Sequence, residues 1–341
     1  MLAAVFHGRG DLRVAERPQP PPPPAGWVQV AVGWCGICGT DLDELLRGPV
    51  LVPVAPHPLT GAQVPLVLGH EAAGTVVAAG AGVALAVGER VGLENGHGCG
   101  SCERCRAGDP QLCAQYACMG LMFDGALAER VNVPAAMCAP LPAGVGDEAA
   151  ALAEPLSVAV RAVRRAGGVR GREVGVIGAG TIGLLVAAVA RAQGAGRVAL
   201  LESSPERLAR ATAQGHAAAL PGERFDVVFE CAGSVGGFDA ALRSTGQQGV
   251  TVLVGIHAQP RTIDLADFIV GERSLVASFS HNLRHDYHDA LGLLAAGAID
   301  IGDLITDRVP LRDVVTRGFQ PLMAEPERHL KVLVDCRPKK P

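Results

Sequence analysis

The chain has 341 residues, of which 49% are hydrophobic and 19% charged, and its net charge at pH 7 is −4. This length is too great for one compact core and indicates two domains, and the composition excludes a disordered chain. The weakly negative charge gives no electrostatic attraction to nucleic acid or to an anionic membrane, so we expect neither as a partner.

The first residues lack the basic start and long apolar core of a signal peptide, and no apolar run approaches the ~20 residues of a membrane span. The ten cysteines are therefore expected to be thiols or metal ligands rather than disulfides. Together these features predict a cytoplasmic protein.

Residues 1–150 predict an irregular, β-rich domain. After five prolines at 20–24, residues 27–32 alternate like a strand. Short apolar runs broken by Gly and Pro then continue to about residue 145, with few convincing helices. The five prolines are interpreted as a stiff connector before the strand.

Four cysteines in this domain form a C-x2-C-x2-C-x7-C array: Cys99, Cys102, Cys105 and Cys113. Four thiolates this close in sequence can close one tetrahedral zinc site. Four sulfur ligands leave no position for water or substrate. The array therefore predicts a structural zinc that holds a loop together, in a lobe at about residues 95–115.

From about residue 150 strands and helices alternate. Residues 149–166 are apolar at helical spacing, and the region ends in a helix over 287–297. Between them we expect strands at 173–177, 197–201, 225–229 and 250–254, and helices at 181–193, 206–214 and 238–242. Such alternation predicts a doubly wound parallel sheet, the Rossmann type of α/β fold, over 151–298. Residues 299–341 regain strand character and are expected to rejoin the first domain.

A dinucleotide fingerprint opens this second domain. Gly178, Gly180 and Gly183 form G-x-G-x-x-G around Ile182, directly after the strand 173–177 and at the start of a helix. Glu202 ends the next strand, 19 positions after the last glycine. Its carboxylate can accept hydrogen bonds from the ribose diol and would repel a 2′-phosphate, while the nearest cation, Arg207, comes five positions on. We expect NAD rather than NADP.

A second set of metal-binding residue types lies apart from the cysteine array. Cys38 stands in Cys-Gly-Thr-Asp, His70 and Glu71 in Gly-His-Glu-Ala-Ala-Gly, and Glu154 in Glu-Pro-Leu-Ser. With the four cysteines and the Gly178 fingerprint, these motifs occur in the order found in the zinc-dependent medium-chain alcohol dehydrogenases, which the chain resembles over essentially its whole length. It is most similar to the bacterial 2,3-butanediol and polyol (sorbitol-type) dehydrogenases.

The resemblance implies a GroES-like catalytic domain and two zinc ions per chain. It makes Cys38 and His70 ligands of a catalytic zinc, with Glu154 or Glu71 as the third ligand, and we favour Glu154. Three protein ligands leave an open coordination position, as catalysis requires. Asp41 is expected to orient His70. Lys331 matches a position where relatives place a cation on the pyrophosphate of the cofactor.

The same resemblance assigns a proton relay to Thr40. Many relatives continue the relay through a histidine three residues later, where this chain has Asp43. A carboxylate with an ordinary pKa near ~4 is a poor proton acceptor at neutral pH compared with histidine. Either water completes the relay, or Asp43 contacts the substrate, or it is a solvent-facing residue without a role.

The leading hypothesis is a reversible, zinc- and NAD-dependent oxidation of a secondary alcohol, of the 2,3-butanediol or vicinal-diol type, to a ketone. One alternative is the same chemistry on a polyol, sugar or aminocyclitol hydroxyl in a biosynthetic pathway. Another is a catalytically silent NAD-binding regulator that keeps only the structural zinc. The resemblance also implies a homo-oligomer, either a tetramer or a dimer.

Overall fold

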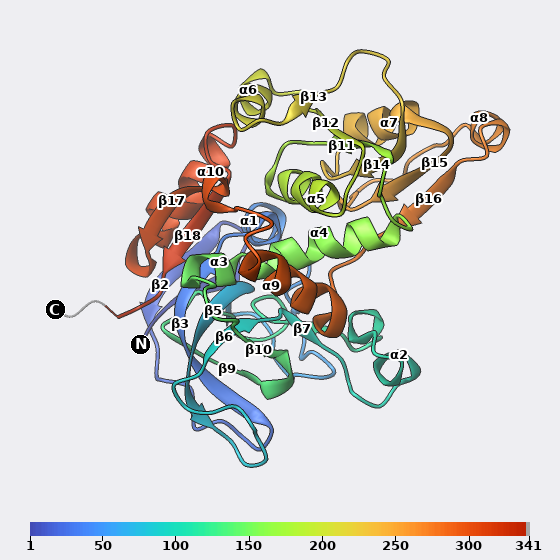
Figure 1. The fold of residues 1–341 in the computed structure, drawn as a ribbon. Coiled ribbons are helices and arrows are strands. Elements are labelled where there is room, and N and C mark those ends of the chain that lie inside the picture. Colours follow the sequence, from blue (N-terminus) through green and yellow to red (C-terminus); the bar gives the residue numbers. More distant parts are fainter. Residues whose placement is uncertain (339–341) are drawn as a thin grey trace. The chain divides into compact units, whose positions relative to one another are not determined.

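The computed structural model describes residues 1–338, and the chain divides into two compact units (Figure 1). The first unit joins Met1–Glu154 to the segment that begins at Asn282, and the second is Pro155–His281. The second unit is shorter at its end than the expected 151–298. The reason is packing: Tyr287 and Leu291 of the last predicted helix share a buried cluster with Ala139 and Ala153 of the first unit.

The first unit is rich in short strands. Its elements up to the second unit are β1 (Leu2–Gly8), β2 (Asp11–Glu16), β3 (Trp27–Gly36), α1 (Gly39–Arg47), β4 (Leu66–Val67), β5 (Glu71–Ala79), β6 (Arg90–Leu93), β7 (Gly96–His97), α2 (Glu103–Arg106), β8 (Ala117–Cys118), β9 (Arg130–Pro134), β10 (Cys138–Pro140) and α3 (Asp147–Ala151). Its later elements are α9 (His288–Ala295), β17 (Ile305–Pro310), α10 (Gln320–Ala324) and β18 (Lys331–Asp335).

Strand β3 is the centre of this unit. The sheet runs β10-β6-β5-β3-β18-β17, and β9 also pairs with β3. β18 pairs antiparallel with β3, with Leu333 opposite Gly36, so the last strand of the chain returns to the first unit. On its other side β3 places the same Gly36 opposite Glu71. The beginnings of β5 and β18 therefore both lie beside the end of β3.

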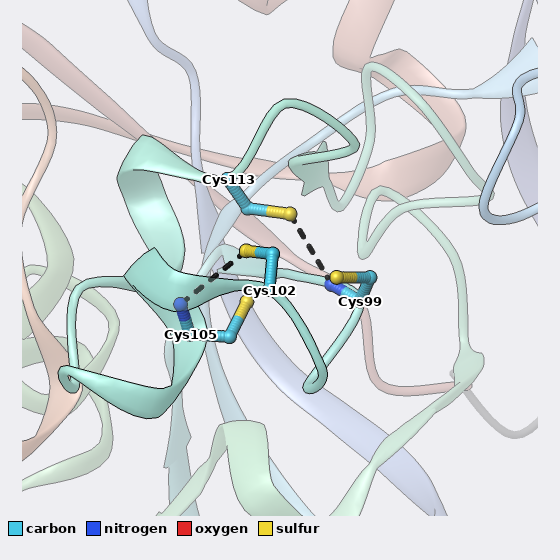
Figure 2. A group of neighbouring side chains, drawn as sticks. All are labelled: Cys99, Cys102, Cys105 and Cys113. Carbon is cyan, nitrogen blue, oxygen red and sulfur yellow. Dashed lines mark hydrogen bonds between the residues drawn. The ribbon is translucent and has the colours of Figure 1, made fainter.

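A small lobe projects from this sheet between β7 and β8 and contains α2. It carries the four cysteines of the predicted zinc site, whose side chains point toward one another (Figure 2). β7 and β8 pair with each other, Gly96 opposite Cys118 and His97 opposite Ala117. The two ends of the lobe are therefore tied together by a short antiparallel ladder.

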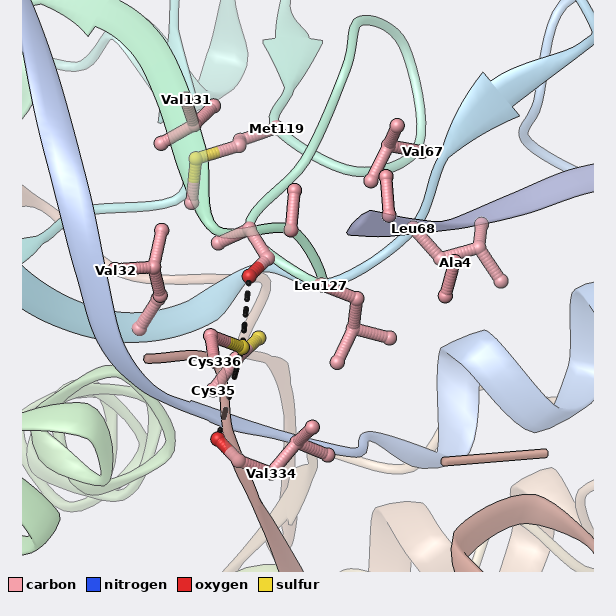
Figure 3. Close-up of a cluster of buried hydrophobic side chains, with 14 of the residues drawn as sticks. Ala4, Val32, Cys35, Val67, Leu68, Met119, Leu127, Val131, Val334 and Cys336 are labelled. Carbon is pink, nitrogen blue, oxygen red and sulfur yellow. Dashed lines mark hydrogen bonds between the residues drawn. The ribbon is translucent and has the colours of Figure 1, made fainter. Parts of the chain in front are cut away.

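The core of the first unit is formed by small and branched apolar side chains from strands far apart in the sequence (Figure 3). Val32 and Cys35 of β3 lie near Val334 and Cys336 at the chain's other end, and all four are at most 2% exposed. The Cys336 thiol contacts the Ala126 carbonyl oxygen at 3.5 Å. These cysteines serve as small buried hydrophobes.

The second unit is a six-stranded parallel sheet. Its elements are β11 (Glu173–Ile177), α5 (Thr181–Ala192), β12 (Arg197–Leu201), α6 (Pro205–Ala213), β13 (Ala217–Ala218), β14 (Phe225–Glu230), α7 (Val235–Ser244), β15 (Thr245–Leu253), α8 (Leu265–Val270) and β16 (Ser274–Ala277). The strand order is β13-β12-β11-β14-β15-β16, which confirms the Rossmann prediction. The order reverses between β11 and β14, where dinucleotides bind in such sheets.

Several helices differ from the sequence expectation. The region 149–166 forms two helices, α3 and then α4 (Ala153–Arg165), which contains the boundary between the units. α1 was not predicted, although the Cys38 amide donates to Asp41 Oδ2 at 2.9 Å, a cap that its Cys-Gly-Thr-Asp sequence supplies.

None of the helices in residues 1–338 combines the length and the apolar character that a bilayer crossing demands.

Candidate metal centres and cofactor site

The sulfur atoms of the four lobe cysteines all lie within 4.8 Å of one another (Figure 2). The Cys99 amide donates to Cys113 Sγ at 3.4 Å, and the Cys105 amide donates to Cys102 Sγ at 3.4 Å. Backbone donors aimed at sulfur stabilise thiolates, the form that binds metal.

The electrostatics of the lobe also fit a cation. The Ser101 hydroxyl donates to Cys99 and lowers the pKa of that thiol to about 6, whereas burial raises the pKa of Cys105 to about 12. Four thiolates at this separation repel one another unless a cation lies between them. Four sulfur donors and no carboxylate are the ligand set of a structural zinc site.

A second cluster of metal-binding groups lies where β3, α1 and β5 meet. Cys38 precedes α1, and His70 and Glu71 lie at the start of β5. One donor atom from each of these three residues lies within 4.8 Å of the others. Sulfur, imidazole nitrogen and carboxylate oxygen are the donors that catalytic zinc sites combine.

Asp41 lies next to His70. Its Oδ1 is 3.5 Å from His70 Nδ1, and both side chains are at most 5% exposed. Burial opposes the charged form of His70, but the negative charges of Asp41 and Cys38 outweigh it and raise its pKa well above the usual range. Groups that attract a proton this strongly also attract a metal cation.

Glu71 forms an ion pair with Lys331 that the sequence did not reveal. Lys331 Nζ donates to Glu71 Oε2 at 2.6 Å and to the Ile37 carbonyl at 2.9 Å, and Lys331 is only 3% exposed. Burial opposes the charge of Lys331, but the attraction of Glu71 outweighs it and raises the lysine pKa. A role for Lys331 at a pyrophosphate, as expected from the resemblance, would require this buried ion pair to open.

Glu154 stands outside the 4.8 Å group of Cys38, His70 and Glu71. Asn95 Nδ2 donates to Glu154 Oε1 at 2.6 Å, and the Tyr116 hydroxyl donates to Asn95 Oδ1 at 3.1 Å. Burial raises the pKa of Glu154 to about 8. Neither Asn95 nor Tyr116 was among the predicted site residues, because only the folded chain brings them to Glu154.

The charge balance of this region supports a cation site. Asp41, Glu71 and Glu154 are each at most 4% exposed, and Lys331 is the buried lysine that faces them. Buried carboxylates persist when they are paired or coordinate a metal. The residues present therefore fit a divalent zinc ion held by Cys38, His70 and one glutamate.

In the second unit two of the three fingerprint glycines, Gly178 and Gly183, occupy positions that require glycine. Gly178 has φ +96°, and a Cβ on Gly183 would lie 1.9 Å from the Gly178 carbonyl oxygen. A Cβ on Gly180 would meet nothing within 4 Å, which leaves open space in front of the loop. α5 begins directly after Gly180, so its positive end faces this space, as a pyrophosphate site requires.

Glu202 links this loop to the end of β12. Its carboxylate accepts hydrogen bonds from the amides of Ala179 at 2.7 Å and Ser204 at 2.8 Å. Burial raises the pKa of Glu202, but these amides outweigh it and lower the pKa overall, with a smaller contribution from the charge of Arg207. Glu202 is thus held as an anion beside the glycine loop. The side chain of Ile182, within the fingerprint, is half-buried.

Two family models match the chain: the alcohol dehydrogenase GroES-like domain over residues 24–143 and the zinc-binding dehydrogenase over residues 181–296. The chain is 35% identical to the (R,R)-butanediol dehydrogenase of Bacillus subtilis, with 98% of this chain and 99% of the relative covered. It belongs to the zinc-dependent medium-chain alcohol dehydrogenase family.

Other members of this family show how broad the similarity is. Sorbitol dehydrogenase 2 of Saccharomyces cerevisiae is 32% identical, with 91% of each chain covered. The crystal structure of 2R,3R-butanediol dehydrogenase from Bacillus subtilis superposes with a TM-score of 0.91 at 34% identity, covering 99% of both chains. The GroES-like and Rossmann folds predicted for this dehydrogenase are thereby confirmed.

Thr40 and Asp43, the residues considered for the proton relay, lie in the first turns of α1. Thr40 is half-buried, and its hydroxyl oxygen lies 3.7 Å from Cys38 Sγ. Asp43 instead has a side chain that is 48% exposed, and its Oδ2 lies 2.7 Å from Arg47 Nη2 on the next turn. An exposed pair of this kind contributes about 0–1 kcal/mol to stability. These contacts favour the solvent-facing interpretation of Asp43.

We expect Asp43→Ala to change kcat by less than about 3-fold, whereas Thr40→Ala should lower it by about 100-fold or more, the typical effect of losing a proton-transfer group. Steady-state NADH formation over a range of pH values measures both. A fall for Asp43→Ala as large as that for Thr40→Ala would contradict the expectation and place Asp43 in the relay.

Proposed function

We propose that this dehydrogenase oxidises a secondary alcohol, a vicinal diol of the butane-2,3-diol type, to the ketone and reduces NAD to NADH, reversibly. The balanced reaction transfers a hydride to the nicotinamide and releases one proton. The observation that supports the proposal most strongly is the cluster of Cys38, His70 and Glu71 beside Glu154 in the first unit. A zinc ion bound there lowers the pKa of an alcohol so that its proton can leave.

The protein groups supply position and proton transfer. Cys38, His70 and Glu154 would hold the metal and leave one coordination position open, and Asp41 would orient the His70 ring. Thr40, next to Cys38, is positioned to receive the alcohol proton. Glu71 is the alternative third ligand, and its ion pair with Lys331 makes it the less available carboxylate, which supports Glu154.

A polyol, sugar or aminocyclitol remains the alternative substrate class, supported by the 32% identical sorbitol dehydrogenase. The test is NADH formation by zinc-loaded protein with butane-2,3-diol, sorbitol and an amino sugar side by side. Turnover of the diol with kcat/KM at least 10-fold above the others supports the proposal. Turnover of a polyol or amino sugar with little turnover of the diol supports the alternative.

For the cofactor we propose NAD over NADP, because Glu202 is anionic where an adenosine ribose would lie. We expect Glu202→Gln to lower kcat/KM with NAD and to raise it with NADP, each by about 10-fold, equivalent to about 1.4 kcal/mol. Glutamine keeps an oxygen that can accept one of the two backbone hydrogen bonds but loses the charge that repels a 2′-phosphate.

The matched control is Glu173→Gln. Glu173 is the first residue of β11, and the glycine loop follows the other end of this strand, so its charge lies away from the cofactor loop. The control should leave the NAD-to-NADP ratio unchanged. An unchanged ratio in Glu202→Gln as well would contradict the assignment of Glu202 to the ribose.

We further propose two zinc ions per chain, a cytoplasmic location and a homo-oligomer, a dimer or tetramer. Three apolar side chains of α8 support self-association, since Leu265, Ile269 and Val270 are 65%, 71% and 81% exposed. β16, at the end of the second sheet, pairs with β15 alone among the strands of residues 1–338, so it offers an open edge. A monomer in light scattering would contradict the oligomer.

A further inference from the structure

Glu154 is connected to the cysteine lobe by a chain of two hydrogen bonds. We call the three residues involved, Tyr116, Asn95 and Glu154, the Asn95 bridge. The phenol donates to Asn95 Oδ1 at 3.1 Å, and Asn95 Nδ2 donates to Glu154 Oε1 at 2.6 Å. Asn95 and Glu154 are 7% and 4% exposed, so water competes little for either group.

The backbone holds both supporting residues at the base of the lobe. Asn95 directly precedes β7, and its carbonyl accepts from the Met119 amide at 2.6 Å. Tyr116 directly precedes β8, and its amide donates to the Cys113 carbonyl at 3.0 Å. The β7–β8 ladder therefore fixes the separation of Asn95 and Tyr116, and the lobe with its four cysteines closes the loop between them.

Gly96 is part of the same arrangement. A Cβ at this position would lie 2.2 Å from the Tyr116 hydroxyl oxygen, so any other residue would displace the ring. The glycine thus leaves space for the phenol to pass over β7 and reach Asn95. Gly96 before the lobe and Tyr116 after it therefore both support the hydrogen bond between Tyr116 and Asn95.

The hydrogen bonds have one consistent direction. Asn95 donates through Nδ2 to Glu154 Oε1, which suits a metal ligand, because a metal-bound carboxylate is ionised and only accepts hydrogen bonds. Asn95 Oδ1 then faces the opposite way and needs a donor, which the Tyr116 hydroxyl provides. Tyr116 therefore fixes the orientation of the amide, and the amide fixes the rotation of the carboxylate.

We propose that Asn95 and Tyr116 are positioning residues that hold Glu154 as a ligand of the catalytic metal. Glu154 lies in the first turn of α4, so its backbone is fixed while its side chain has three rotatable bonds. Asn95 restricts that rotation by holding Oε1 and presents Oε2 to the metal. This inference rests on the proposed function for the metal site but not on the identity of the substrate.

Cobalt(II) tests the proposal, because a cobalt site with a thiolate ligand absorbs visible light in a manner sensitive to its ligands. In Asn95→Leu, which keeps the side-chain volume but cannot donate, we expect the affinity of the catalytic site for cobalt to fall by about 10- to 100-fold and its spectrum to change. In Tyr116→Phe, which removes one hydroxyl, we expect a fall of about 3- to 10-fold. Competition with a chelator gives the affinities, and the lobe site should keep its metal in both variants.

Two further variants make the result interpretable. Asn132→Leu removes another amide of the first unit, one that donates to the Pro21 carbonyl at 2.9 Å, and should leave the cobalt spectrum unchanged. Glu154→Ala should lose as much affinity as Asn95→Leu or more. The proposal is overturned if Asn95→Leu and Tyr116→Phe keep the parent affinity and spectrum, or if Glu154→Ala does. Because no substrate is used, failure of the diol assay would not affect this result.

Discussion

Cys113→Ser is expected to remove one zinc ion per chain and to lower the thermal midpoint by about 10 °C or more. Loss of a structural zinc costs several kcal/mol, and each kcal/mol shifts the midpoint of a domain of this size by about 2–4 °C. Cys113 is only 7% exposed and accepts from the Gln115 amide at 3.3 Å, so it anchors the end of the lobe nearest to Tyr116. A serine hydroxyl stays protonated and is a poor zinc ligand.

The loosened lobe should also become a substrate for trypsin. Arg104 and Arg106 lie in α2 inside the lobe and are exposed, and the fold of the lobe protects the bonds that follow them. Zinc content, calorimetry and limited digestion of the variant measure the three effects together. If the Asn95 bridge depends on the lobe, the catalytic site of Cys113→Ser should lose metal to a chelator faster than the parent does.

Cys138→Ser is the matched control. Cys138 is 8% exposed and belongs to the apolar core of the first unit rather than to the metal sites. Its replacement should cost about 1–3 kcal/mol, the penalty for burying a poorly satisfied hydroxyl, without loss of zinc or new cleavage in the lobe. Equal zinc contents in parent and Cys113→Ser would show that the four cysteines do not hold a structural metal.

The features of the molecule that can be recognised in the sequence depend on short-range patterns. The four cysteines fall between residues 99 and 113, so any compact fold of this segment brings them near one another. The glycines from Gly178 to Gly183 are recognisable because a tight turn and a close helix need residues without a Cβ. In the second unit, continuous apolar strands alternate with helices along the sequence. This pattern reflects a parallel sheet that helices bury on both faces.

The contacts that escaped prediction join residues far apart in the sequence. Lys331 and Glu71 meet because β18 and β5 flank the end of β3, a register that no local pattern encodes. Glu154 meets Asn95 across 59 positions. α9 has an ordinary helical pattern, and only the burial of Tyr287 beside Ala139 and Ala153 assigns it to the first unit. Sequence thus indicates which chemical groups are present more readily than which neighbours orient them.

His70→Ala is expected to lower kcat by about 1,000-fold or more while the dinucleotide site stays intact. His70 is 4% exposed between Cys38 and Asp41, so alanine removes a proposed metal ligand and leaves the Asp41 carboxylate without its imidazole neighbour. Without the metal, the alcohol keeps its ordinary pKa and the reaction loses at least about 4 kcal/mol of stabilisation. Zinc content should fall from two ions per chain to one, and NADH binding followed by fluorescence should be unchanged.

His329→Ala serves as the matched control, since His329 pairs with Asp307 at 2.8 Å elsewhere in the first unit and should be dispensable for activity.

The zinc contents also distinguish an active enzyme from a catalytically silent NAD-binding regulator. A parent protein with two zinc ions, of which His70→Ala loses one together with turnover, carries both sites. A parent protein with one zinc, and a His70→Ala variant with the same content, would mean that Cys38, His70 and Glu154 do not bind metal and that only the cysteine lobe does.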